Sequence, residues 1–447
     1  MSKPYLTSPQ KLTTMPPGIP YIVGNEAAER FNFYGMRAVL FVFMTKYLLD
    51  STGAVAPMTE NEANRWYHLF LSANYFFPTI GAIVSDAFLG KYRTIFWLSL
   101  VYALGSVVLA LDHTRTGLTI GLTLIAIGAG GIKPCVSSHV GDQFGPDNKH
   151  LLARAFGWFY FSVNAGSSVS IYLIPILLAK SGPGAAFGLP AVLMLIAVYI
   201  FWRGRHKFVH IPPGGLGFLR ETFSREGLGA LGRLALIFVF MVAFWALWDQ
   251  SGSEWVAQAG KMDLNFLGMQ FLASQIQVVN AIFTVSFIPL FQYVIYPFVD
   301  RHVCRVTPLR KIGAGLVTIG LSFFVSAWIE SQLAAGVTLN IGWQLPAYVL
   351  LTAGEVMASI TALEFAYTQA PRSMKAVVQA LYLLSVSAGN LFAAGVHWII
   401  ENPDGTTKLH GAAYYNFYAW FSIGAAVVFT LFALRYKEKT YLQGEPA

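Results

Sequence analysis

The sequence predicts an all-α, polytopic membrane protein, and its composition and charge pattern support that fold class. Of its 447 residues, 55% are hydrophobic and only 12% are charged, whereas a soluble domain carries about 25% charged residues. The charged residues cluster between apolar stretches of about 20 residues, a length that crosses a bilayer as a helix. The net charge of +8 is therefore interpreted first as a topology signal and not as a nucleic-acid footprint.

Twelve apolar segments predict twelve transmembrane helices. Their centres lie near residues 35, 76, 101, 129, 166, 193, 245, 284, 319, 356, 388 and 423. A polar leader precedes the first of them, and its Pro16-Pro17 pair disfavours a helix there. We expect no cleavable signal, because this leader has neither an apolar core nor a small-residue cleavage site.

The basic residues predict the orientation of these spans. Most of the 30 lysine and arginine residues fall in the segments on the side that holds both termini. The positive-inside rule then places both termini in the cytoplasm, in a plasma membrane that we expect to be a bacterial inner membrane. The same bias explains the basic composition without any nucleic-acid partner.

The longest polar stretch divides the chain into two sets of six spans. The expected domains are a cytoplasmic leader (1–20), a six-helix bundle (21–205), a cytoplasmic linker (206–231), a second six-helix bundle (232–436) and a cytoplasmic tail (437–447). Two six-helix halves are typical of the major facilitator fold, which binds substrate at the midplane between the halves. The chain has no phosphate-binding Gly-x-x-x-x-Gly-Lys-Ser/Thr loop, so a gradient and not ATP would drive it.

Charged residues inside spans are the strongest functional candidates, because a charge in hydrocarbon needs a partner or a water-filled cavity. In the first span Glu26, Arg30, Tyr34 and Arg37 follow one another at helical spacing, with Glu29 beside them. They form one polar stripe. A salt-bridge ladder that only lets a polar helix insert is the alternative, but two carboxylates and two guanidiniums exceed that need.

Two further spans carry a charge near their midpoints. Lys133 lies in the fourth span, where its ammonium cannot easily reach an interface; its expected partner is Glu29 or a substrate carboxylate. Glu355 lies near the middle of the tenth span, and Glu364 lies on the opposite face of the same helix. Depth favours Glu355 as the residue that lines a cavity, and Glu364 is interpreted as a packing or cytoplasmic-gate residue.

Weaker candidates for functional residues are polar or aromatic side chains in three further spans. They are His68 and Tyr75 in the second span, Trp245, Trp248 and Asp249 in the seventh, and Gln277 and Asn280 in the eighth. His68, Arg37 and Asp249 share one depth, so protonated His68 paired with Asp249 would close an outer gate. A buried neutral histidine that is hydrogen-bonded within its own half is the alternative, and aromatic stripes usually pack helices.

Several motifs resemble those of the proton-dependent oligopeptide transporter family. Residues 26–34 read EAAERFNFY and are similar to the E-x-x-E-R-F-x-Y-Y signature of that family. Residues 159–167 (FYFSVNAGS) are similar to its second signature. The segments 130–137 (GGIKPCVS), 141–144 (GDQF) and 244–252 (FWALWDQSG) resemble animal-type members in particular.

The resemblance implies a symporter that imports di- and tripeptides with protons, by alternating access. Arg30 and Lys133 would bind the peptide carboxylate, and Asn164, Asn280 and Glu355 its α-amine. Glu26, Glu29 and Arg30 would couple protons together with His68 and Asp249, while Arg37 would share the outer gate and line the peptide site. Tyr34, Tyr75, Trp245 and Tyr382 would shape the pocket.

Three positions depart from the family pattern. Phe33 replaces a tyrosine, Tyr382 replaces a pocket tryptophan, and Trp248 replaces the glutamate of many bacterial members. The linker is too short for the two extra helices of many bacterial members. The segment before Trp343 has no room for the large extracellular domain of animal members, which favours a microbial origin.

Two other functions remain open at this point. One is a proton-coupled carrier of nitrate or another small anion, although an anion alone needs no amine-binding carboxylate. The other is a transport-dead peptide sensor, which should carry a sizeable cytoplasmic domain. We expect no enzyme activity, metal or cofactor other than the coupling proton, and no obligate protein partner beyond membrane lipid. Cys135 and Cys304 do not suggest a disulfide framework.

Overall fold

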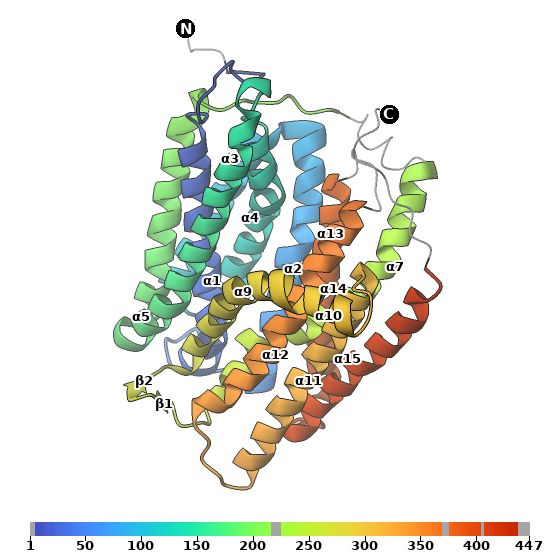
Figure 1. The fold of residues 1–447 in the computed structure, drawn as a ribbon. Coiled ribbons are helices and arrows are strands. Elements are labelled where there is room, and N and C mark those ends of the chain that lie inside the picture. The colour runs from blue at the N-terminus through green and yellow to red at the C-terminus, as the bar shows by residue number, and fades with distance from the viewer. Residues whose placement is uncertain (1–4, 216–224, 369–374, 404–405, 437–447) are drawn as a thin grey trace. The chain divides into compact units, whose positions relative to one another are not determined.

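The fold is that of a computed structural model, which describes residues 5–215, 225–368, 375–403 and 406–436. Long helices dominate it (Figure 1). The expected tail, 437–447, and linker residues 216–224 lie outside the described residues. The helix α7 (Arg225–Trp248) begins within the expected linker.

The chain forms two compact units. The first contains residues 1–58 and 73–224, and the second contains residues 59–72 and 225–447. Helix α2 (Glu60–Val84) therefore contributes to both, with its first part in the second unit. His68 and its neighbours belong by this division to the same unit as the seventh span.

The first unit is built from four further long helices. These are α1 (Ile19–Lys46), α3 (Lys91–Leu111), α4 (Arg115–Gly141) and α5 (Leu152–Arg203). α1 packs along α5, and α3 packs along α4 (Figure 1). Gly182, with φ at +77°, breaks α5, at the point where the sequence separates its fifth and sixth spans. Short turns of 3-10 or π helix lie at Ser85–Leu89, Pro146–Leu151 and Gly204–His206.

The second unit holds the remaining helices. They are α7, α8 (Glu254–Ala259), α9 (Val278–Leu290), α10 (Tyr296–His302), α11 (Pro308–Ala334), α12 (Leu345–Glu355), α13 (Thr361–Thr368), α14 (Lys375–Ile400) and α15 (Ala412–Ala433). α11 packs on α12 and α15, and α7 packs on α14. Short 3-10 turns lie at Asp249–Gly252, Ala273–Gln277 and Ile341–Gln344. π-helical turns join α9 to α10 (Phe291–Ile295) and α12 to α13 (Val356–Ile360). Strands β1 (Asn265–Phe266) and β2 (Met269–Gln270) form a small hairpin.

In the described part of the chain, nine helical segments are long and apolar enough to cross a membrane. One of them, Pro146–His206, contains both the fifth and the sixth predicted span. α1 and α2 coincide with the first two predicted spans and carry many polar residues. The helical membrane fold is thus confirmed, and the count of twelve spans stays a prediction.

Glycines let the helices that carry the candidate charges approach closely. A Cβ on Gly81 of α2 would lie 1.9 Å from the carbonyl oxygen of Gly130 in α4, one turn before Lys133. In the second unit, a Cβ on Gly315 of α11 would lie 2.9 Å from the carbonyl oxygen of Gly354, beside Glu355. Small residues are the usual means by which membrane helices pack closely, so both central charges lie on tightly packed backbone.

The leader docks on the start of the linker. The backbone N–H of His210 donates to the Leu6 carbonyl at 2.6 Å, and the Tyr5 ring stacks on His210 at 4.1 Å between centroids. His210 Nε2 lies 2.7 Å from the Arg205 carbonyl and therefore donates to it. The neutral imidazole satisfies these contacts, and burial lowers the pKa of His210 although the bond to Arg205 opposes the shift.

We expect this docking to weaken in acid. The folded protein binds the second proton of His210 less well than the unfolded chain. The contribution is therefore complete above the ordinary histidine pKa of about 6.5 and is lost as the pH falls through the lowered value. His210→Phe keeps the stacking and cannot titrate. Melting temperatures in detergent from pH 8 to pH 5 should fall more for the wild type than for H210F; parallel curves would contradict the role of His210.

Candidate functional site

The stripe on α1 forms a buried ionic cluster. Arg30 Nε donates to Glu26 Oε1 at 2.7 Å and lies 2.9 Å from Glu29 Oε2. Glu26 is 4% exposed and Glu29 is 0% exposed. In the part of the chain that the structure describes, neither carboxylate oxygen of Glu29 has a hydrogen-bond partner. One guanidinium is thus shared between two buried carboxylates, which leaves Glu29 with acceptor capacity to spare.

Lys133 on α4 lies against aromatic rings instead of a carboxylate. Its Nζ is 4.1 Å from the ring centroids of both Phe33 and Tyr75. Within the described ranges this buried Nζ has no hydrogen-bond partner and no ion pair, so the expected direct pair with Glu29 is not formed. Cation–π contact stabilises the ammonium without using its donors. The cation is therefore held in place with three donors available to a ligand.

Other predicted residues of the first unit surround this cluster. Tyr34 and Tyr75 both meet the Phe33 ring edge-on, with centroids at 5.3 and 6.5 Å. Arg37 is buried one turn along α1. Asn164 on α5 is exposed and donates to the Tyr160 carbonyl of its own helix at 2.8 Å, so its amide oxygen is the part that faces away from the helix backbone.

Glu355 is the centre of the site in the second unit. Its Oε2 accepts from Trp248 Nε1 at 3.0 Å and from Asn280 Nδ2 at 2.9 Å, and Asn280 also donates to Thr352 Oγ1 at 3.1 Å. The π-helical turn Val356–Ile360 begins immediately after it, and such turns often occur at functional positions. Two donors thus fix one oxygen of a half-buried carboxylate.

Trp245 and Tyr382 pack beside this carboxylate. The two rings meet at right angles with centroids 5.8 Å apart, and Trp245 meets Trp248 at 5.6 Å. Ser359 bonds the Tyr382 hydroxyl at 2.7 Å. Trp245 Nε1 is buried without a hydrogen-bond partner in the described chain. Trp248, a weaker candidate of the seventh span and a departure from the family pattern, is a hydrogen-bond donor to Glu355.

His68 and Asp249 meet within the second unit, and Asn390 bridges them. His68 Nδ1 lies 2.8 Å from Asn390 Oδ1, and Asn390 Nδ2 donates to Asp249 Oδ2 at 2.6 Å. All three are 0% exposed. Their shared depth could be predicted, but Asn390 was not; the signal for it was a lone asparagine in the apolar eleventh span. Arg37, the third member of the expected gate, belongs to the first unit.

The two units thus carry different charge chemistry. The first holds a lysine and an arginine beside two carboxylates, and the second holds a carboxylate fixed by neutral donors. Over the described ranges, no three histidine, cysteine, aspartate or glutamate side chains are placed to hold a metal ion.

Comparison with known proteins decides the family. The PTR2 family model, described as the POT family, matches residues 92–225 and 224–416. The chain belongs to the POT family. Among curated POT relatives, Peptide transporter family 1 of Drosophila melanogaster is 39% identical over 71% of this chain and 48% of its own length. Human Solute carrier family 15 member 2 is 34% identical over 71% of this chain and 49% of its own length.

Solved structures of POT proteins match nearly the whole chain. An auto inhibited POT family peptide transporter has a TM-score of 0.85 and 34% identity, covering 97% of this chain and 99% of that one. The POT transporter PepTSo has a TM-score of 0.85 and 33% identity, covering 94% and 98%. The chain spans about half the length of the curated relatives it matches. The resemblance to the POT family is confirmed, and so is the fold.

We expect the indole N–H of Trp248 to stabilise the ligand-free protein through Glu355. Trp248→Phe removes one hydrogen bond to a carboxylate, which contributes about 1 to 2 kcal/mol. Trp245→Phe is the matched control, because its N–H makes no hydrogen bond in the described chain. The melting temperature in detergent should fall more for W248F than for W245F. Equal losses would mean that ring volume, and not the bond to Glu355, accounts for the effect.

Proposed function

We propose that this multi-pass membrane protein is a proton-coupled symporter that imports di- and tripeptides by alternating access. The observation that carries the proposal is the pair of opposite, preorganised charges, Lys133 in one unit and Glu355 in the other. Relatives that are named peptide transporters support it. The basic-residue bias supports cytoplasmic termini and a plasma membrane, with the bacterial inner membrane as the expected location.

The carboxylate end of the peptide binds in the first unit. Lys133 offers donors that no described group uses, and Arg30 is the second cation. A carboxylate that approaches Lys133 replaces a weak aromatic contact by a charge-assisted hydrogen bond. Phe33 holds the ammonium without competing for its protons, so the loss of a tyrosine hydroxyl at this position removes a rival acceptor.

The ammonium end binds in the second unit at Glu355. Trp248 and Asn280 both donate to Oε2, so the carboxylate is held in one orientation, in which we propose that it accepts from the amine. Asn164 of the first unit adds an amide oxygen for the same end. Recognition of the two fixed ends leaves the side chains unspecified, which explains tolerance of many peptides.

Proton coupling uses the carboxylates on α1 and the His68–Asn390–Asp249 group. Arg30 neutralises Glu26 and Glu29 until another anion competes for it. A peptide carboxylate at Arg30 then favours protonation of a carboxylate on α1. A carrier of nitrate or another small anion is less well supported, because such a substrate gives Glu355 no amine to bind.

We expect Glu355→Gln to weaken the binding of free dipeptides about tenfold or more. The affinity for N-acetylated dipeptides should stay nearly unchanged. The loss corresponds to one charge-assisted hydrogen bond. Binding to purified protein, followed by tryptophan fluorescence or calorimetry, measures both ligands. Glu364→Gln is the control, since Glu364 lies in α13, beyond the π-helical turn, and is exposed. If E355Q weakened both ligands equally, Glu355 would not be the amine site.

We expect Glu26→Gln to abolish proton-driven accumulation of peptide while peptide exchange across the membrane continues. In proteoliposomes with an imposed pH gradient, E26Q should lose uphill accumulation of dialanine, because one exchangeable carboxylate is gone. Counterflow of dialanine needs no net proton movement and should persist. Undiminished accumulation in E26Q would remove Glu26 from the coupling set, and competition by nitrate but not by dialanine would overturn the choice of substrate.

A further inference from the structure

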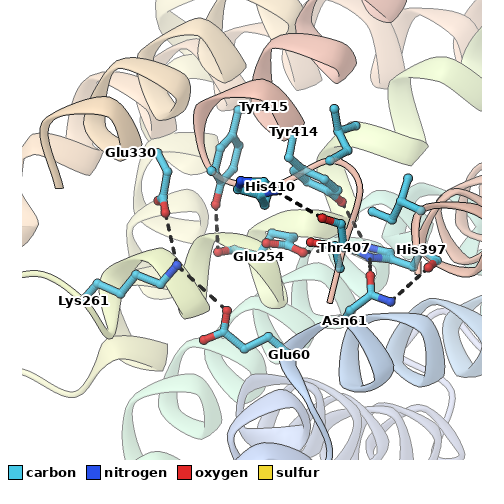
Figure 2. A pocket seen from close by; sticks show the side chains of 13 residues that line it. Glu60, Asn61, Glu254, Lys261, Glu330, His397, Thr407, His410, Tyr414 and Tyr415 are labelled. Carbon is cyan, nitrogen blue, oxygen red and sulfur yellow. Dashed lines mark hydrogen bonds and ion pairs between the residues drawn. The ribbon is translucent and has the colours of Figure 1, made fainter. Parts of the chain in front are cut away.

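A polar pocket in the second unit lies apart from Glu355 and has no part in the function so far. It encloses about 130 Å³ and is shown in Figure 2. Three carboxylates, an ammonium and two imidazoles line it, from Glu60, Glu254, Glu330, Lys261, His397 and His410. The predicted topology places this end of the unit outside the cell. We call it the outer pocket.

The ammonium in the outer pocket forms ion pairs with two of the carboxylates. Lys261 Nζ lies 3.1 Å from Glu330 Oε1 and 3.9 Å from Glu60 Oε2 (Figure 2). Gln258 donates to the other oxygen of Glu330 at 3.1 Å. Burial opposes the charge, yet these carboxylates raise the pKa of Lys261 above its ordinary value. Lys261 therefore stays charged and is not the proton carrier here.

Glu254 is the carboxylate without a fixed cation. Its Oε1 accepts from Asn64 Nδ2 at 2.7 Å and lies 3.8 Å from His397 Nε2. Among the described residues, His397 is its only ion-pair partner, and that imidazole is charged only when it is protonated. Glu254 and His397 can thus form an ion pair only when one extra proton is bound.

The orientation of Asn61 fixes one proton of His397. Asn61 Nδ2 donates to the His397 carbonyl at 3.0 Å, so Asn61 Oδ1 is the atom 2.9 Å from His397 Nδ1. An amide oxygen only accepts, and therefore Nδ1 carries a proton in every state. Any proton gained or lost by this imidazole is gained or lost at Nε2, the atom that faces Glu254.

Tyr414 makes the network sensitive to that second proton. Its hydroxyl lies 3.0 Å from His397 Nε2 and 3.0 Å from Gln250 Oε1. Gln250 Nε2 donates to the Ala246 carbonyl, so Gln250 Oε1 can only accept. A neutral His397 leaves two acceptors to share one hydroxyl proton, whereas a protonated Nε2 donates to Tyr414 and frees the hydroxyl for Gln250.

His68 is the next titratable group inward. Its ring is stacked on His397 with centroids 6.0 Å apart and planes 14° apart. Asn390 donates both amide protons, to Asp249 and to the Val386 carbonyl, so His68 Nδ1 must be the donor to Asn390 Oδ1. His68 therefore also titrates at Nε2. Two imidazolium rings at this distance repel, so only one of the two histidines holds the extra proton at a time.

The remaining charged groups nearby are occupied elsewhere. Arg65 is paired with Glu401, and His410 is exposed and bonded to the Thr407 carbonyl. The Tyr415 hydroxyl donates to the backbone carbonyl of Glu254 at 3.1 Å. His397 is 1% exposed, and its ring nitrogens face Asn61, Tyr414 and Glu254.

We propose that Glu254 and His397 form an outer proton-binding site that exchanges with external solution and competes with His68 for one proton. The inference rests on the proposed proton symport and adds its entry site. On loading, a hydronium O–H bond breaks and a bond forms at His397 Nε2 or at the Glu254 carboxylate. Loss of that proton removes the repulsion that keeps His68 neutral, so protonation of His68 Nε2 follows.

The test is the external-pH profile of gradient-driven dialanine uptake in proteoliposomes. Glu254→Gln keeps the carbonyl that accepts from Asn64 but removes the charge that favours protonation of the site. The midpoint of its profile should move to lower pH by about one unit, the usual effect of one adjacent charge. Glu60→Gln is the matched control, because it removes the same charge from a side chain of the same pocket that is 58% exposed, and it should move the midpoint much less.

His397→Gln provides the second variant, with a readout that a merely structural role would not reproduce. Its midpoint should shift at least as far, and the double variant E254Q/H397Q should shift no further, because both changes remove one site. Counterflow should be unchanged in all of them. An E254Q profile identical to E60Q, or additive shifts in the double variant, would overturn the inference while leaving symport intact. Wild-type protein with no gradient-driven uptake would overturn the proposed function itself.

Discussion

The energetic penalty for placing charge in hydrocarbon is the constraint on which the rest of this structure depends. Each of three buried ionic groups is stabilised by a different kind of partner. Arg30 is held by two carboxylates, Lys133 by two aromatic rings, and Glu355 by an indole and an amide. In the described part of the chain, the arrangement at Lys133 leaves all hydrogen-bond donors of the ammonium unused. The unused donors of Lys133 thus lower stability, and they are also what makes this ammonium a candidate ligand-binding group.

The departures from the family pattern are compensated by chemistry that keeps the same charges in place. Phe33 has no hydroxyl but presents its ring to the Lys133 ammonium. Trp248 has no carboxylate but donates to Glu355. In both positions a group that could exchange a proton is replaced by one that cannot. The substitutions therefore concentrate the proton chemistry on fewer side chains.

Sequence reasoning could predict what is local or strongly periodic. The bond between Glu26 and Arg30 follows from their spacing of one helical turn, and the membrane spans follow from their length and apolarity. The bridge from His68 through Asn390 could not be derived, because it joins residues that are 322 positions apart. Lys133 was expected to meet a carboxylate; its aromatic contacts depend on side-chain directions that a span diagram does not contain.

The π-helical turn after Glu355 has an evolutionary consequence. A π turn is an α-helix with one residue too many, so it records an insertion that the helix absorbed without losing its hydrogen-bonded backbone. Deleting one residue from Val356–Ile360 would restore regular α-helix there and leave α12 and α13 close to their present faces, because the wide turn already absorbs the extra residue. Glu355 and α13 would keep their neighbours, and only the wall formed by the turn itself would change. Single-residue length changes at this turn are thus a route by which relatives could alter one wall of the site and preserve the carboxylate.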